Sequence, residues 1–178
     1  RDAHFSMRNH ALNQVNGRNA HRATKDIGEG FRVWTERPYV EAERDNFSLA
    51  NMVHHFKTFR CFEHLPNIHL MHYADMQHDL RGEMLRCAAY LDIEVAEDAI
   101  DALAAAAGFE NMKRNASQFA PGAGQNRWKA ESRFFYKGTD RQWRFDLSVD
   151  DLAVYDARIR EMLSESDVAW LQSGNAGA

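Results

Sequence analysis

The chain has 178 residues, 44% of them hydrophobic, which is enough for one globular domain with a buried core. No stretch approaches the run of about 18 apolar residues that a membrane helix needs, and the start of the chain is too polar for a signal peptide. The two cysteines lack CxxC spacing, which argues against a disulfide scaffold or a cysteine-rich zinc site. We therefore expect a single domain in the cytoplasm, without a membrane span.

The net charge of −4 is unevenly distributed along the chain. Residues 127–144, the basic segment, carry a local charge of +4 and leave −8 for the rest. Its basic residues are Arg127, Lys129, Arg133, Lys137, Arg141 and Arg144. The acidic remainder would repel a long polyanion such as duplex DNA. The preferred partner is a small phosphorylated or sulfated ligand, with no nucleic acid.

The first third of the chain predicts two helices separated by irregular structure. Apolar residues predict a helix over residues 3–15. Residues 16–44 are rich in glycine, asparagine, arginine and glutamate, and beyond an apolar patch around residues 31–34 they predict irregular chain with short helical pieces. Helical spacing resumes at Leu49, and that helix should end near Pro66.

The middle of the chain predicts a strand followed by a helix. Residues 68–73, Ile-His-Leu-Met-His-Tyr, form a mostly apolar run of strand length, and a helix over residues 80–91 follows. Such a run is typical of a parallel strand covered on both faces. The predicted fold class is therefore α/β, a short parallel sheet flanked by helices, with the 80–91 helix packed on the 68–73 strand.

The remaining elements are helices and loops. A helix is expected over residues 96–107, a turn over 109–112 and a loop over 115–130, which contains Pro121 and two glycines. Ser148 and Asp151 have the spacing of a capping box and predict an amphipathic helix that continues to about residue 163. The small residues 173–178 are expected to form a flexible tail.

Within the basic segment, Lys137, Gly138 and Thr139 have the makings of an anion-binding loop. Glycine lets backbone approach a ligand closely, and lysine adds a charge-assisted hydrogen bond to a phosphate oxygen. A solvated basic loop pinned by its aromatic neighbours explains charge and glycine equally well. Nine histidines raise the question of a metal, but His69 and His72 would point to opposite faces of a strand, so we expect no metal site.

Four segments, in this order, resemble the later part of the sulfotransferase family that uses 3'-phosphoadenosine 5'-phosphosulfate (PAPS). They are Arg-Asp-Ala-His-Phe-Ser at 1–6, His-Tyr-Ala-Asp-Met at 72–76, Gly-Phe-Glu-Asn-Met-Lys at 108–113 and Tyr-Lys-Gly-Thr-Asp-Arg-Gln-Trp at 136–143. The likeness extends over nearly the whole chain, and bacterial members look closest. It implies a P-loop-NTPase-like sulfotransferase fold and sulfuryl transfer from PAPS to a hydroxyl or amine of a small-molecule acceptor.

The resemblance also implies a set of cofactor-binding residues. Ser6, Lys137 and Gly138 would hold the 3'-phosphate of PAPS, and of the product adenosine 3',5'-bisphosphate. Tyr73 and Phe109 would line the adenine. Tyr136 stands where the family signature often has arginine, and Arg141 stands in place of a glycine, where its charge would partly restore the lost phosphate contact.

Other expected family features are absent from the sequence. The phosphosulfate-binding loop and the catalytic histidine should precede Arg1, and the chain opens without an initiator methionine. We expect residues 1–178 to be a single partial sulfotransferase domain, inactive alone, with no catalytic residue of its own. The dimerisation pattern has Ala153 in place of glutamate, so the oligomeric state stays open.

Two other functions remain open at this point. The aromatic residues Trp128, Phe134, Phe135 and Tyr136 could stack on bases in a nucleotide or single-stranded nucleic-acid binding module built on residues 127–144. The chain could also be a fragment with a fold and no independent activity. The acceptor cannot be read from the sequence, because variable loops shape such pockets.

Overall fold

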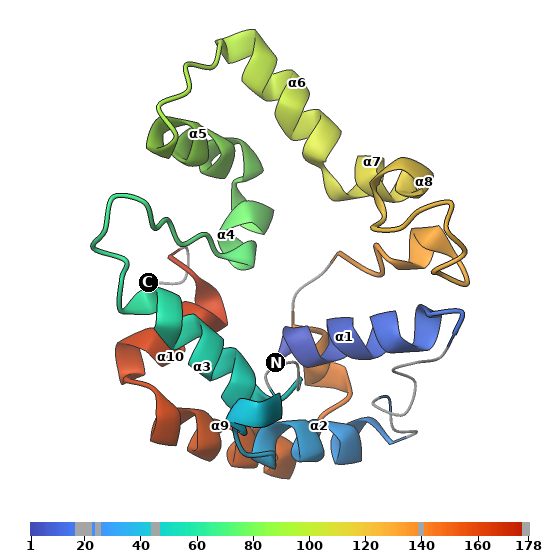
Figure 1. The fold of residues 1–178 in the computed structure, drawn as a ribbon, viewed down its shortest axis with the longest axis vertical. Coiled ribbons are helices and arrows are strands. Elements are labelled where there is room, and N and C mark those ends of the chain that lie inside the picture. The colour runs from blue at the N-terminus through green and yellow to red at the C-terminus, as the bar shows by residue number, and fades with distance from the viewer. Residues whose placement is uncertain (17–22, 24–25, 44–46, 139–140, 176–178) are drawn as a thin grey trace. The chain divides into compact units, whose positions relative to one another are not determined.

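The computed structural model describes residues 1–16, 23, 26–43, 47–138 and 141–175, and the elements in these ranges are helical (Figure 1). They divide into two compact units, unit 1 with residues 1–30 and 96–147, and unit 2 with residues 31–95 and 148–178. Each unit is therefore built from two separate stretches of the chain. None of the helices in the described ranges is both long and apolar enough to cross a membrane.

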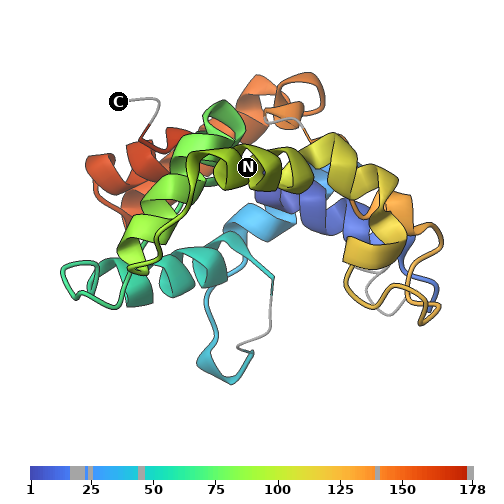
Figure 2. The ribbon, with the colours of Figure 1, turned by 90° about the horizontal axis from the view of Figure 1, so that it is seen from above.

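Unit 1 contains the first helix and the elements between residues 96 and 147. They are α1 (Asp2–Asn13), α6 (Glu97–Ala107), α7 (Phe109–Arg114), α8 (Ala116–Phe119) and the 3₁₀ turns η3 (Glu131–Arg133) and η4 (Gln142–Phe145). Gly108 ends α6 and precedes α7. These two helices are drawn in yellow-green and yellow in Figure 2. The chain after α8 returns along the end of α1, where the backbone N–H of Lys129 donates to Asn13 O at 2.7 Å.

Unit 2 has an aromatic core between α2 (Ile27–Glu36), which enters this unit at Phe31, and α9 (Val149–Met162). Phe31 is fully buried, and its ring centroid lies 5.5 Å from that of Trp34 and 5.8 Å from that of Tyr155. The helices α3 (Leu49–Arg60) and α10 (Glu165–Ser173) pack against α9 (Figure 1). Ser148 and Asp151 form the predicted capping box at the start of α9. The Nε of Arg32 on α2 lies 2.8 Å from Asp151 Oδ1 and ties the two helices together.

Two further helices of unit 2, α4 (Tyr73–His78) and α5 (Leu80–Tyr90), share one residue as a cap. The backbone N–H of Asp79 donates to Asp75 O at 2.8 Å and closes α4, while its carboxylate accepts from the Gly82 N–H at 2.8 Å and opens α5. One side chain and its own backbone therefore fix the turn between the two helices.

Residues 68–73 do not form the predicted strand, and the predicted short parallel sheet is not confirmed within the described ranges. Residues 68–72 belong to no regular element and are half-buried or exposed, and Tyr73 begins α4. A strand needs a neighbouring strand for its backbone groups, and the described ranges contain a single isolated bridge, between Gln14 and Trp128 in unit 1. The segment still contacts α5, because the ring of His69 stacks on that of Tyr90, with the ring centroids 4.6 Å apart.

The helical predictions fare better. The structure confirms helices close to the predicted positions at α1, α3, α5, α6 and α9. The stretch expected to be mainly irregular contains α2, and α10 was not predicted. In the expected flexible tail, Ser173 ends α10 and Asn175 donates to Asp75, whereas residues 176–178 lie outside the described ranges.

Candidate functional site

The Lys137-Gly138 pair is held against α7 in unit 1. Gly138 has a φ of +66°, and a Cβ built on it would lie 2.6 Å from the Cγ of Phe109. From the same helix, the Nζ of Lys113 donates to the carbonyl oxygen of Tyr136 at 2.9 Å. Both the conformation and the close approach require glycine. The adenine-lining and phosphate-binding candidates Phe109 and Gly138 are therefore in direct contact.

Lys137 itself projects from this braced backbone. Its side chain is exposed, with Nζ 5.3 Å from the centroid of the neighbouring Tyr136 ring. An exposed ammonium beside a glycine leaves room for an anion to meet both the charge and the backbone. Thr139, which the sequence also placed in the anion loop, lies outside the described residues.

Ser6 and Arg141 lie on two elements of unit 1 that touch. Ser6 is exposed on α1, and Arg141 is exposed just before η4. The carboxylate of Asp2 accepts from the Gln142 N–H at 3.1 Å, and the Arg1 guanidinium lies 4.5 Å from the centroid of the Trp143 ring. The first turn of α1 is thereby fixed to the turn that follows Arg141.

Arg141 replaces a glycine of the family signature and keeps the backbone conformation that glycine favours. Its φ is +59°, in the left-handed region, which costs an L-residue roughly 1–2 kcal/mol. Arg141 thus holds a backbone conformation that glycine usually adopts, and it adds a positive charge at this position.

Most aromatic side chains of the basic segment are used for packing. Trp128 is buried and its Nε1–H donates to Pro121 O at 2.7 Å. The Phe134 ring stacks on His10 at 4.6 Å and meets Phe135 edge-on. Of the four candidate stacking residues, only Tyr136 has an exposed side chain. A base-stacking surface for single-stranded nucleic acid is therefore not favoured.

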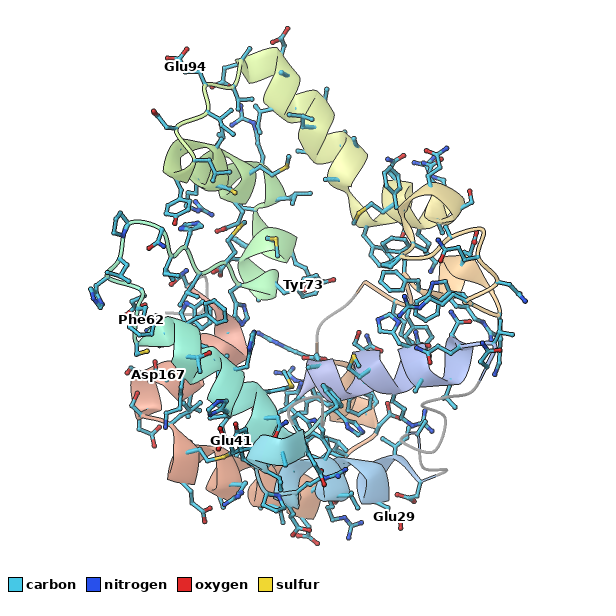
Figure 3. All side chains as sticks on the ribbon, in the orientation of Figure 1. Glu29, Glu41, Phe62, Tyr73, Glu94 and Asp167 are labelled. Atoms are coloured by element: carbon cyan, nitrogen blue, oxygen red, sulfur yellow. The ribbon has the colours of Figure 1, made fainter. Side chains whose placement is uncertain are left out.

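Tyr73, the remaining candidate, belongs to unit 2, where it projects from the first turn of α4 with 54% of its surface exposed (Figure 3). The neighbouring His72 accepts from the Ala74 N–H through Nδ1 at 3.1 Å, and its Nε2 lies 3.2 Å from Leu171 O. The buried carboxylate of Asp75 accepts from both the backbone and the side-chain nitrogen of Asn175 at 3.0 Å. An exposed aromatic ring thus stands on a firmly braced helical turn.

Two site residues escaped prediction, Lys113 as a brace for the loop and Asp2 as the link between α1 and η4. Their partners lie 23 and 140 positions away in the chain, so no local pattern could reveal these contacts. For Lys113 a signal existed, because it follows Phe109 by four residues and so shares its helix face.

Unit 1 also holds a buried histidine with a shifted pKa. His4 is buried on α1, and burial, together with the positive charges of the amino terminus and of Arg8, lowers its pKa from 6.5 to about 4. Within the described ranges, no group of three or more histidine, cysteine, aspartate or glutamate residues is placed to hold a metal ion.

Comparison with solved structures finds a similar fold in mouse sulfotransferase SULT7A1, crystallised in complex with PAP. The TM-score is 0.71 at 17% sequence identity, and the match covers 94% of this chain and 56% of the mouse chain. The described ranges contain no strands, so this likeness supports the sulfotransferase fold without the predicted sheet.

Among curated proteins, the chain is 34% identical over 156 residues to a glycolipid sulfotransferase of Mycobacterium bovis, covering 84% of this chain and 48% of that protein. It is 31% identical over 107 residues to an amine sulfotransferase of Oryctolagus cuniculus, covering 56% of this chain and 34% of that protein. The chain thus spans about half the length, or less, of these relatives. Residues 4–167 match the family model for the sulfotransferase domain. The chain therefore belongs to the sulfotransferase family.

Proposed function

We propose that the protein containing this chain transfers a sulfuryl group from PAPS to a hydroxyl or amine of a small-molecule acceptor. Family membership supports sulfuryl transfer, and the mouse neighbour crystallised with PAP supports the donor. The acceptor class follows the relatives named for glycolipid and amine sulfation. The free thiols of Cys61 and Cys87 suit a cytoplasmic protein.

The contact between Gly138 and Phe109 carries this proposal. It joins a phosphate-binding candidate to an adenine-lining candidate. Lys113, on the same helix as Phe109, donates to the carbonyl oxygen of Tyr136, two residues before Gly138. When bound, PAPS supplies the activated sulfuryl group. In this proposal Ser6, Lys137, Gly138 and Arg141 of unit 1 hold the 3'-phosphate, and Phe109 lines the adenine. Tyr73, which belongs to unit 2, stays an adenine-lining candidate from the family resemblance alone.

We further propose that residues 1–178 alone do not turn over PAPS. The chain spans 48% of the mycobacterial relative, and we assign no acceptor-deprotonating or sulfuryl-holding residue within it. The role of this chain in the proposed enzyme is to bind and orient the nucleotide.

The test is Lys137→Ala in the natural protein that contains this chain, with binding of adenosine 3',5'-bisphosphate measured by calorimetry. A charge-assisted hydrogen bond contributes roughly 1.5–3 kcal/mol, so the dissociation constant should rise about 10- to 100-fold. Adenosine 5'-phosphate lacks the 3'-phosphate, and its affinity should stay nearly unchanged.

The matched control is Arg133→Ala, which removes another exposed positive charge from the basic segment outside the proposed site. It should leave both affinities close to those of the unmodified protein. If Lys137→Ala weakened both nucleotides equally, or acted no differently from Arg133→Ala, the assignment of Lys137 to the 3'-phosphate would be wrong.

A further inference from the structure

His10 lies one helical turn after Ser6 on α1, with its Nε2 3.4 Å from the Ser6 hydroxyl oxygen. The imidazole ring is held by aromatic neighbours, stacked on Phe134 at 4.6 Å and tilted against Trp128 at 5.7 Å. This packing fixes the plane of the ring and so the direction of its two nitrogens. One of them faces a serine that the proposed function places against a phosphate.

The surroundings of His10 determine which ring nitrogen carries the proton. Burial lowers the pKa of His10 from its ordinary value of 6.5, so the ring is neutral at pH 7 and has one N–H. Its Nδ1 is buried and has no hydrogen-bond partner within the described ranges. Either tautomer leaves Nδ1 unpaired, but a buried N–H without an acceptor is rarer in proteins than a buried acceptor without a donor. The favoured tautomer carries the proton on Nε2, facing Ser6.

When Nε2–H donates to Ser6, the serine hydroxyl is the acceptor in that hydrogen bond and can donate its own proton elsewhere. The hydroxyl has a single proton of its own, and a serine that donated it to His10 could not also donate it to a ligand. A serine that accepts from His10 keeps its proton for an outside acceptor, and Ser6 is exposed. We propose that His10 is a positioning residue that holds Ser6 as a hydrogen-bond donor to the 3'-phosphate, an inference that rests on the proposed function.

The test is a double-mutant cycle of Ser6→Ala and His10→Phe in the natural protein, with affinities measured for adenosine 3',5'-bisphosphate and adenosine 5'-phosphate. Phenylalanine keeps a ring beside Phe134 and removes the N–H. We expect Ser6→Ala to weaken the bisphosphate about tenfold and His10→Phe about three- to fivefold. The double variant should be no weaker than Ser6→Ala, and neither change should alter the affinity for the monophosphate.

A histidine of unit 2 provides the matched control. His55 is exposed on α3 and meets the Phe59 ring edge-on at 5.0 Å. His55→Phe makes the same substitution at a residue that the proposal does not assign to the phosphate, and it should leave both affinities unchanged. His10→Gln, whose side chain can still donate a hydrogen bond, should recover part of the affinity that His10→Phe loses.

A second measurement does not depend on how the variants fold. Nitrogen NMR of the unmodified protein distinguishes the two imidazole tautomers, and the Nε2–H form is expected for His10. The Nδ1–H form, or additive losses in the cycle, would overturn the positioning role. A protein that binds both nucleotides equally before any substitution would instead contradict the proposed function, so the two failures are distinguishable.

Discussion

Replacing Gly138 with alanine tests the contact on which the candidate site depends. The added Cβ would lie 2.6, 2.6 and 2.7 Å from three carbons of the Phe109 ring. Overpacking of this kind costs about 1–3 kcal/mol. The φ of +66° adds roughly 1–2 kcal/mol for any residue with a side chain. We therefore expect Gly138→Ala to lower the free energy of unfolding by about 2–5 kcal/mol.

Gly124 offers a matched control in the same unit. Its φ is +74°, but a Cβ at this position would meet nothing within 4 Å, so Gly124→Ala should cost only the roughly 1–2 kcal/mol of the backbone conformation. Urea unfolding followed by circular dichroism measures both variants under identical conditions. The difference between them isolates the collision with the Phe109 ring.

The double variant Phe109→Ala/Gly138→Ala completes the argument. Without the ring, the second substitution should cost no more than Gly124→Ala does. Equal losses for Gly138→Ala and Gly124→Ala in the unmodified background would refute the reasoning, because the backbone conformation alone would then explain the effect.

Two further predictions concern pH and turnover. The pKa of His4 is near 6.5 in the unfolded chain and about 4 in the folded protein. Between these pH values the unfolded state binds a proton that the folded state does not. The free energy of unfolding therefore falls as the pH is lowered, by up to about 3 kcal/mol. Urea unfolding at pH 7 and pH 4.5 should show this loss in the unmodified chain and a smaller loss in His4→Gln, and an equal loss in both would exclude His4 as its source. For turnover, we expect the purified 178-residue chain, given PAPS and a mixture of phenolic and amine acceptors, to release no adenosine 3',5'-bisphosphate above background. Sustained release would disprove the proposal that the chain is inactive alone.

The positions of most helices could be predicted, because the signals that start and end a helix are local in the sequence. The Ser148 and Asp151 spacing predicted the start of α9 because a capping box is satisfied within four residues. The apolar spacing after Leu49 located α3 for the same kind of reason. The sequence did not predict α2, because glycines occupy two of its first four positions and weaken the helical signal. Its residues Phe31 and Trp34 are nevertheless buried in the core of unit 2.

The strand prediction failed because an apolar run indicates that its residues prefer burial. It does not show whether a neighbouring strand is present to pair with their backbone. Residues 68–72 have suitable composition, but His72 caps α4 and the chain turns into a helix at Tyr73. In the candidate site, the resemblance identified Phe109 and Gly138 separately. Their contact joins residues far apart in sequence, and only the structure could show it.

The discontinuous composition of unit 2 has a consequence for synthesis of the protein. Phe31 and Trp34 leave the ribosome early, whereas Tyr155, which packs against both, follows more than a hundred residues later. At about 5–20 residues per second, the wait is on the order of ten seconds. During that interval the apolar face of α2 lacks its native cover, which makes the nascent chain a candidate client for holding chaperones.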